Sequence, residues 1–161
     1  MRSPFADTWA DAIAEITTDV EFQNATIVII DESLVTSTYD IDTGLTVVTG
    51  DPRVYQGQAR VKPMRAPVNR EGSAVANSNA ITSVRVQLPQ MVDFSQTSTP
   101  SYRTKRGWKM LVLTAPKNLS LLDYWFSLEE GLQGASAASR TLEFMVDGDA
   151  TVDRAALTWL T

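Results

Sequence analysis

The amino-acid sequence predicts one mainly β domain, a small antiparallel β-barrel or sandwich that carries an N-terminal α-helix and two long loops. The chain has 161 residues, which fits a single domain (1–161) with a sizeable core. From residue 26 onward, β-branched runs follow one another at short intervals and are separated by turn residues. No helical segments alternate with these runs, which argues against a parallel sheet. We therefore expect the β domain to span residues 26–160.

The first predicted element is an amphipathic helix over residues 4–16. Ser3 is a favoured N-cap residue, and Pro4 suits the first helical position. Apolar side chains then recur at helical spacing, at Phe5, Trp9, Ile13 and Ile16. Three acids lie about 200° around the helix from the aromatic side chains, namely Asp7, Asp11 and Glu15. This acidic face is expected to contact water or a partner.

A buried strand and a hairpin are expected next. Residues 26–30 form a short, continuous apolar run, which indicates a strand covered on both faces. Residues 37–40 and 45–49 flank a turn sequence, residues 42–44, that ends in Gly44. Because glycine takes positive φ easily, the two runs are expected to pair as a β-hairpin.

Two alternating strands and two long loops follow. Residues 54–63 and 81–88 alternate apolar and polar side chains, so they are expected to be half-buried, antiparallel partners. Between them, residues 64–79 contain prolines, asparagines and few bulky apolar side chains, which predicts a long exposed loop. Residues 95–107 predict a second such loop. We expect both loops to become ordered against a partner.

The last third of the chain adds further strands. Apolar or aromatic runs predict them at residues 108–113, 124–128 and 140–146. Residues 147–149, Asp-Gly-Asp, then predict a hairpin turn that leads into residues 152–160.

Composition excludes several classes of function. The chain has no cysteine and no histidine, which excludes disulfides, thiolate or histidine-ligated zinc sites and Ser-His-Asp catalysis. The formal net charge of −5 has the wrong sign for a domain held to nucleic acid by counterion release. No apolar run approaches the ~20 residues that cross a bilayer. We therefore expect no enzyme, no catalytic or metal-binding residues, no cofactor and no membrane contact.

Three local patterns could suggest other functions. Residues 147–149 could hold calcium, but the spaced oxygen ligands of a full calcium loop are missing. Two pairs of acids could suggest acid–base catalysis, but both lie in or beside predicted turns: Asp40 with Asp42, and Asp31 with Glu32. Four tryptophans could stack on the bases of single-stranded nucleic acid, but they occupy positions typical of core residues: Trp9, Trp108, Trp125 and Trp159.

A set of spaced features resembles a known viral family. It comprises residues 106–116, Leu119, and residues 124–128, 136–140 and 142–144, with an upstream strand at 55–61. These features resemble the head-to-tail connector proteins of long-tailed bacteriophages, especially the stopper or head-completion group. Trp108 stands where that family often has aspartate, no glycine directly precedes Tyr124, and the tail after Asp149 is long. These differences leave a tail terminator or adaptor open.

The resemblance implies a virion protein of the phage neck, assembled in the host cytoplasm. Such a protein forms a homo-oligomeric ring of about six subunits. Portal and adaptor proteins lie on its head side, and the tail terminator or tail tube lies on its tail side. The ring retains packaged double-stranded DNA, which passes through its channel, and gives the tail a docking surface. The alternatives are a tail terminator or another connector or minor tail protein and, more remotely, a small β-barrel that binds nucleic acid.

Three groups of charged residues are candidates for contacts in such an assembly. The 64–79 loop is the candidate channel or inter-ring element, through Arg65, Arg70 and Glu71. The 95–107 loop is the candidate contact with the adaptor or tail, through Arg103, Lys105 and Arg106. The helical acids form a candidate helix interface with basic loops of a neighbouring ring, through Asp7, Asp11 and Glu15.

Overall fold

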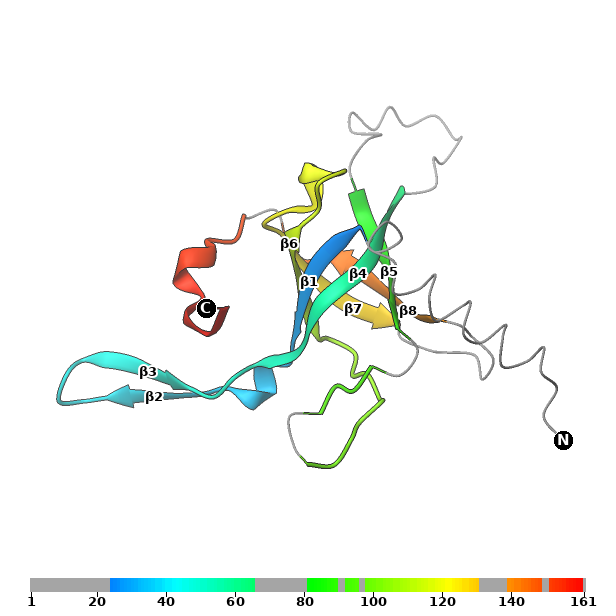
Figure 1. The fold of residues 1–161 in the computed structure, drawn as a ribbon. Coiled ribbons are helices and arrows are strands. Elements are labelled where there is room, and N and C mark those ends of the chain that lie inside the picture. Colours follow the sequence, from blue (N-terminus) through cyan, green and yellow to red (C-terminus); the bar gives the residue numbers. More distant parts are fainter. Residues whose placement is uncertain are drawn as a thin grey trace, which may run out of the picture.

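The fold is a closed antiparallel β-barrel with a separate two-stranded hairpin (Figure 1). The computed structural model describes residues 24–65, 81–89, 92–95, 98–130, 139–148 and 151–160. The predicted mainly β class is therefore confirmed. Of the two predicted architectures, barrel and sandwich, the structure has the barrel. The predicted helix over residues 4–16 lies outside the described residues, as do residues 66–79 of the first loop.

Six strands form the barrel and two form the hairpin. The barrel strands are β1 (Ala25–Ile30), β4 (Arg53–Arg65), β5 (Ile81–Pro89), β6 (Lys109–Thr114), β7 (Trp125–Glu130) and β8 (Ser139–Val146). The hairpin consists of β2 (Thr36–Asp40) and β3 (Leu45–Thr49). Short 3-10 turns complete the described elements: η1 (Glu32–Leu34), η2 (Leu119–Leu121), η3 (Arg154–Ala156) and η4 (Thr158–Leu160).

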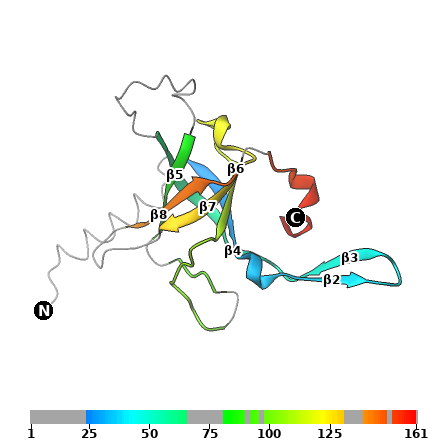
Figure 2. The same ribbon diagram turned by 180° about the vertical axis from the view of Figure 1, so that it is seen from behind.

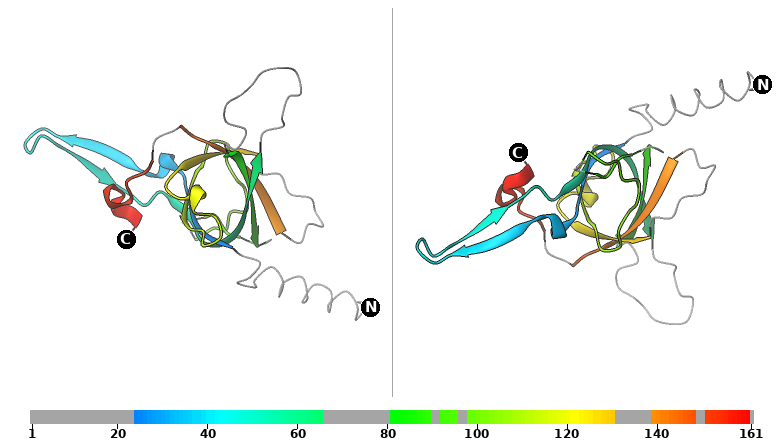
Figure 3. Two further views of the ribbon diagram at one scale, coloured as in Figure 1. Left: turned by 90° about the horizontal axis from the view of Figure 1, so that it is seen from above. Right: turned by 90° about the horizontal axis from the view of Figure 1, so that it is seen from below.

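The barrel closes because β1 pairs with two strands that are far apart in the sequence. The order around the barrel is β1-β4-β5-β8-β7-β6, and β1 also pairs with β6 (Figure 3). The predicted partnership of residues 54–63 and 81–88 is confirmed, with Val61 opposite Val86. A closed barrel leaves no long sheet edge exposed to other chains.

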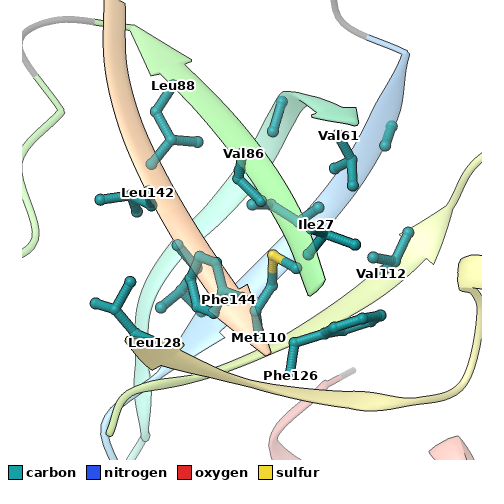
Figure 4. Close-up of a cluster of buried hydrophobic side chains, with 14 of the residues drawn as sticks. Ile27, Val61, Val86, Leu88, Met110, Val112, Phe126, Leu128, Leu142 and Phe144 are labelled. Carbon is teal, nitrogen blue, oxygen red and sulfur yellow. The ribbon is translucent and has the colours of Figure 1, made fainter. Parts of the chain in front are cut away.

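Side chains from all six strands fill the barrel (Figure 4). Each of the following is at most 2% exposed: Ile27, Val61, Val86, Met110, Phe126, Leu142 and Phe144. Leu121 of η2 is buried in the same cluster, and η2 lies at the upper end of the barrel in Figure 1. A small barrel of this kind is a packed core and not a pore.

The strand predicted to be covered on both faces is confirmed. Ile27 and Ile29 of β1 point into the barrel, whereas Val28 and Ile30 point outward into a second apolar cluster. That cluster is completed by Leu111 and by side chains of the C-terminal turns, including Leu157 and Trp159. β1 therefore needs an apolar residue at nearly every position.

Residues 152–160 do not continue the β-structure as predicted. They form η3 and η4, which lie against the outside of the barrel (Figure 1). The closed barrel offers no edge to another strand, so this apolar segment packs on the barrel as turns. Arg154 holds it there by donating to the carbonyl oxygens of Leu113 (2.8 Å) and Val112 (3.1 Å) and by pairing with Asp123.

The second predicted loop covers the lower end of the barrel in Figure 1. Its described residues, 95 and 98–107, lie outside helices and strands, as expected. Phe94 is buried and packs edge-on against Trp108, with ring centroids 5.3 Å apart. The Phe94 amide donates to Ser101, and Asp93 accepts from the amides of Ser95 and Ser101. These hydrogen bonds join residues 93–101 to one another, and the contact with Trp108 places the segment against the barrel. Ordering of the loops against a partner stays a prediction.

Arg140 is a buried cation at the same end of the barrel. Its side chain lies beside Phe94, with the guanidinium carbon 4.9 Å from the ring centroid. The residue is 6% exposed, and Nε has no hydrogen-bond partner in the structure. Within the described part of the chain it pairs with no carboxylate. Burial lowers the pKa of Arg140, as expected for a charge removed from water.

Replacing this buried cation should stabilise the fold. Arg140→Met keeps most of the side-chain volume and removes the desolvated charge, so we expect the free energy of unfolding to rise by about 1–2 kcal/mol. Urea denaturation would measure the change, with the exposed Arg106→Met as the matched control. A clear loss of stability would show that the contact with the Phe94 ring outweighs the cost of burying the charge.

Core truncation should have the opposite effect. Phe144→Ala removes a fully buried ring from the barrel interior and should lower the free energy of unfolding by about 3–5 kcal/mol. Tyr39→Ala, at an exposed hairpin position, should change it by less than about 0.5 kcal/mol. Equal losses in the two variants would show that the hairpin is part of the core, which the structure excludes.

Candidate functional site

The hairpin of β2 and β3, residues 36–49, projects from the barrel and is called the arm below (Figures 1 and 2). The predicted hairpin is therefore confirmed. None of its residues is buried, although several are large and apolar. The exposed fractions are 63% for Tyr39, 85% for Ile41, 65% for Leu45 and 56% for Val48. Such a concentration of exposed apolar side chains is typical of an interaction surface.

Both faces of the arm carry apolar side chains. In the antiparallel register, Thr38 lies opposite Val47 and Asp40 lies opposite Leu45, so these four share one face. Tyr39 and Val48 belong to the other face. A two-stranded hairpin is marginally stable alone in water, and both of its edges have unpaired backbone groups. The arm therefore has the properties of a surface that a partner covers.

The tip of the arm is a well-ordered turn. The Asp40 carboxylate accepts from the Asp42 amide at 3.0 Å and from the Thr43 hydroxyl at 2.8 Å. The hydrogen bond from Thr43 lowers the pKa of Asp40. Gly44 has a φ of +67°, as expected from its place in the predicted turn. Asp40 and Asp42 are thus part of a turn, as the sequence indicated, and not an acid–base pair.

The base of the arm is fixed to the barrel. The Asp31 amide donates to the carbonyl oxygen of Pro52 at 2.8 Å, which joins the two chain segments that enter and leave the arm. Gly50 has a φ of +108°, and a Cβ there would lie 2.5 Å from the carbonyl oxygen of Leu34. At this position the chain that leaves the arm passes close to the chain that enters it, and only glycine fits there without displacing the backbone. The arm therefore leaves the barrel in a defined direction.

Asp31 is the buried carboxylate of this base. It accepts from the amide and hydroxyl of Ser33 and from Nζ of Lys105 at 3.1 Å. Burial alone would raise the pKa of Asp31, but the hydrogen bonds from Ser33 and Lys105 outweigh it and lower the pKa to about 2. Glu32 pairs instead with Lys109 at 3.0 Å. The neighbouring acids therefore act in two separate ion pairs.

The arm and its base are acidic. Between Ser33 and Pro52 the chain has no lysine or arginine and three aspartates, Asp40, Asp42 and Asp51. Soluble proteins commonly place lysine on an exposed strand edge to prevent pairing with other chains. This protection is missing from the arm.

The basic residues of the 95–107 loop lie near the arm base. Lys105 contacts Asp31, and Arg106 pairs with Glu129 at 2.9 Å. Arg103 is exposed and makes no ion pair with any described residue. The loop therefore uses two of its three predicted site residues within its own chain and leaves one available.

The other predicted site residues are placed elsewhere or not at all. Arg65 ends β4 at the upper end of the barrel, opposite the 95–107 loop, because β4 begins beside Ile30 at the lower end. The remaining candidates lie outside the described residues: Arg70, Glu71, Asp7, Asp11 and Glu15. The start of the first candidate contact loop and the second candidate contact loop therefore lie at opposite ends of the barrel.

The tryptophans in the described ranges have packing roles, as predicted. Trp108 is 5% exposed beside Phe94, and Trp125 packs against Trp159 with ring centroids 6.5 Å apart. Trp9 lies outside the described residues.

Among the described residues, no group of three or more acids could hold a metal ion. No helix in these ranges is long and apolar enough to cross a membrane.

Comparisons of the chain with protein-family models, with curated proteins and with solved structures find no match.

The role of Asp31 in fixing the arm base gives a pH-dependent prediction. Its folded pKa of about 2 lies below the ordinary value of 3.8, so its stabilisation is complete above about pH 4 and is lost as the pH falls through 2. Asp31→Asn should lower the free energy of unfolding by about 1 kcal/mol at pH 5, after allowance for solvent screening. Urea denaturation across this pH range should show the two proteins converging near pH 2. A constant difference would contradict the assignment.

Proposed function

We propose that this protein is a structural subunit of a ring in the neck of a tailed bacteriophage, in the role of head-to-tail stopper. The arm is the observation that carries the proposal. It is an ordered, rigidly based hairpin with apolar side chains on both faces, and nothing in the described part of its own chain covers it. A neighbouring subunit in an assembly would cover the arm, whereas a catalytic function would not explain an exposed apolar hairpin.

A ring is the assembly that an arm of this kind favours. The arm is one surface, and the barrel surface that receives it in a neighbour is another. Such heterologous contacts form closed rings when the rotation between copies is suitable. The resemblance to connector proteins implies a ring of about six subunits.

Candidate contact residues lie at both ends of the barrel, which supports a position of this protein between two other rings. Arg103 is exposed at the lower end, and β4 reaches Arg65 at the upper end. In the proposed assembly, one end faces the portal and adaptor proteins and the other faces the tail terminator or tail tube. Arg65, Arg70 and Glu71 remain the proposed channel or inter-ring contacts. Asp7, Asp11 and Glu15 remain the proposed helix interface.

The charge of the chain is compatible with a DNA channel. The formal net charge of −5 disfavours tight binding to phosphates. Packaged double-stranded DNA could therefore pass through such a ring without being held by its wall. This location would place the protein in the virion after assembly in the host cytoplasm.

Inactivation of the gene in the phage that carries it tests the proposal directly. Electron microscopy of the resulting particles should show tailless heads that have lost their DNA, beside free tails of normal length. Abnormally long tails would instead identify a tail terminator. Normal infectious particles would contradict a structural role in the neck, and a wild-type copy supplied in trans provides the control.

A further inference from the structure

The outer face of β4, β5 and β8 is a basic surface on an acidic protein. Lys62 and Arg85 lie directly opposite each other on neighbouring strands. Like charges in that arrangement repel each other and destabilise the sheet. Glu143 of β8 lies next in the row and pairs with Arg85 at 2.7 Å. Arg60 is exposed on the same face, so the described residues of these three strands have three positive charges and one negative charge there. We call it the basic face.

The basic face also includes an apolar patch. Ser83 lies between Met64 of β4 and Met145 of β8 in the row adjacent to Lys62 and Arg85. Met145 is 48% exposed, and Met64 is half-buried. Positive charge and apolar surface therefore lie side by side.

One face of the arm has the complementary chemistry. Asp40, Leu45 and Val47 share that face, so a carboxylate stands beside two exposed apolar side chains. Asp40 is charged at neutral pH, as an exposed aspartate is, and its hydrogen bond from Thr43 lowers its pKa further. Asp42 adds a second acid at the tip. The arm therefore matches the basic face in both charge and apolar character.

The arm leaves the barrel on the side away from β5 and β8 (Figure 3). A chain therefore cannot place its own arm on its own basic face. A neighbouring copy can, because each copy offers one arm and one basic face.

We propose that the arm of one copy lies across the basic face of the next copy. Leu45 and Val47 cover Met145, and Asp40 and Asp42 approach Lys62 and Arg85. The like-charge pair of Lys62 and Arg85 is then neutralised in the assembly, and the exposed arm is covered. The inference deepens the proposed function and rests on it, since it names the contact that repeats around the ring.

Engineered cysteines test the contact, because the natural chain has none. A chain with both Val47→Cys and Ser83→Cys, treated with a short bismaleimide, should give a ladder of covalent multimers. Each single variant should give no ladder. The pair Val48→Cys and Ser83→Cys is the matched control, since Val48 lies on the opposite face of the arm, and it should give several-fold less product.

A charge substitution tests the electrostatic part. Lys62→Glu in the Val47→Cys, Ser83→Cys chain should reduce the ladder at least tenfold. Lys117→Glu, at an exposed turn away from the basic face, should leave it unchanged. Equal ladders in the two variants would overturn the assignment of the basic face.

Sedimentation of the wild-type protein separates failure of this inference from failure of the proposed function. Wild-type multimers without a cysteine ladder would overturn the arm-to-face contact and leave the ring intact. A covalent dimer from Val47→Cys alone would show that arms pair with each other, which also overturns it. A wild-type protein that stays monomeric at every concentration, with no ladder, would overturn the contact, whereas the proposed function is tested separately by the particles that form when the gene is inactivated.

Discussion

Closure of the barrel is the constraint on which the rest of the structure depends. Because β1 pairs with both β4 and β6, the interior is sealed and filled by side chains from six strands. Any further apolar segment must either pack on the outside or leave the barrel. The C-terminal turns pack on the outside, over Val28 and Ile30. The arm projects away from the barrel. The same constraint therefore produces one apolar surface that is covered and one that is uncovered.

The base of the arm determines how that uncovered surface is presented. Asp31 joins the start of the arm to Lys105 of the neighbouring loop, and Gly50 allows the two chain segments to cross at close distance. A surface held in one direction loses little conformational entropy when a partner binds it. The proposed ring contact therefore begins from an arm that is already oriented by its own barrel.

Local patterns predicted most strands, because alternation and turn residues act over short distances. The hairpin around Gly44 and the pairing of residues 54–63 with 81–88 followed from such patterns. Closure depends on pairing between distant strands, which no local pattern specifies. Residues 152–160 have the apolar content of a strand, so their packing as turns was not predicted. The exposure of the arm was also missed, although its lack of lysine and arginine, with apolar residues on both faces, was a usable signal.

The exposure of the arm implies two different rules for amino-acid replacement within one short chain. Positions inside the barrel, such as Phe144, are restricted by volume, because every neighbour is a fixed part of the same molecule. Positions on the arm, such as Tyr39, contribute almost nothing to the barrel, so their own fold places little restriction on them. In the proposed assembly, their restriction comes from another molecule. Across descendants of this gene, the arm should then change together with the surface that it is proposed to bind, while the barrel interior keeps its volumes.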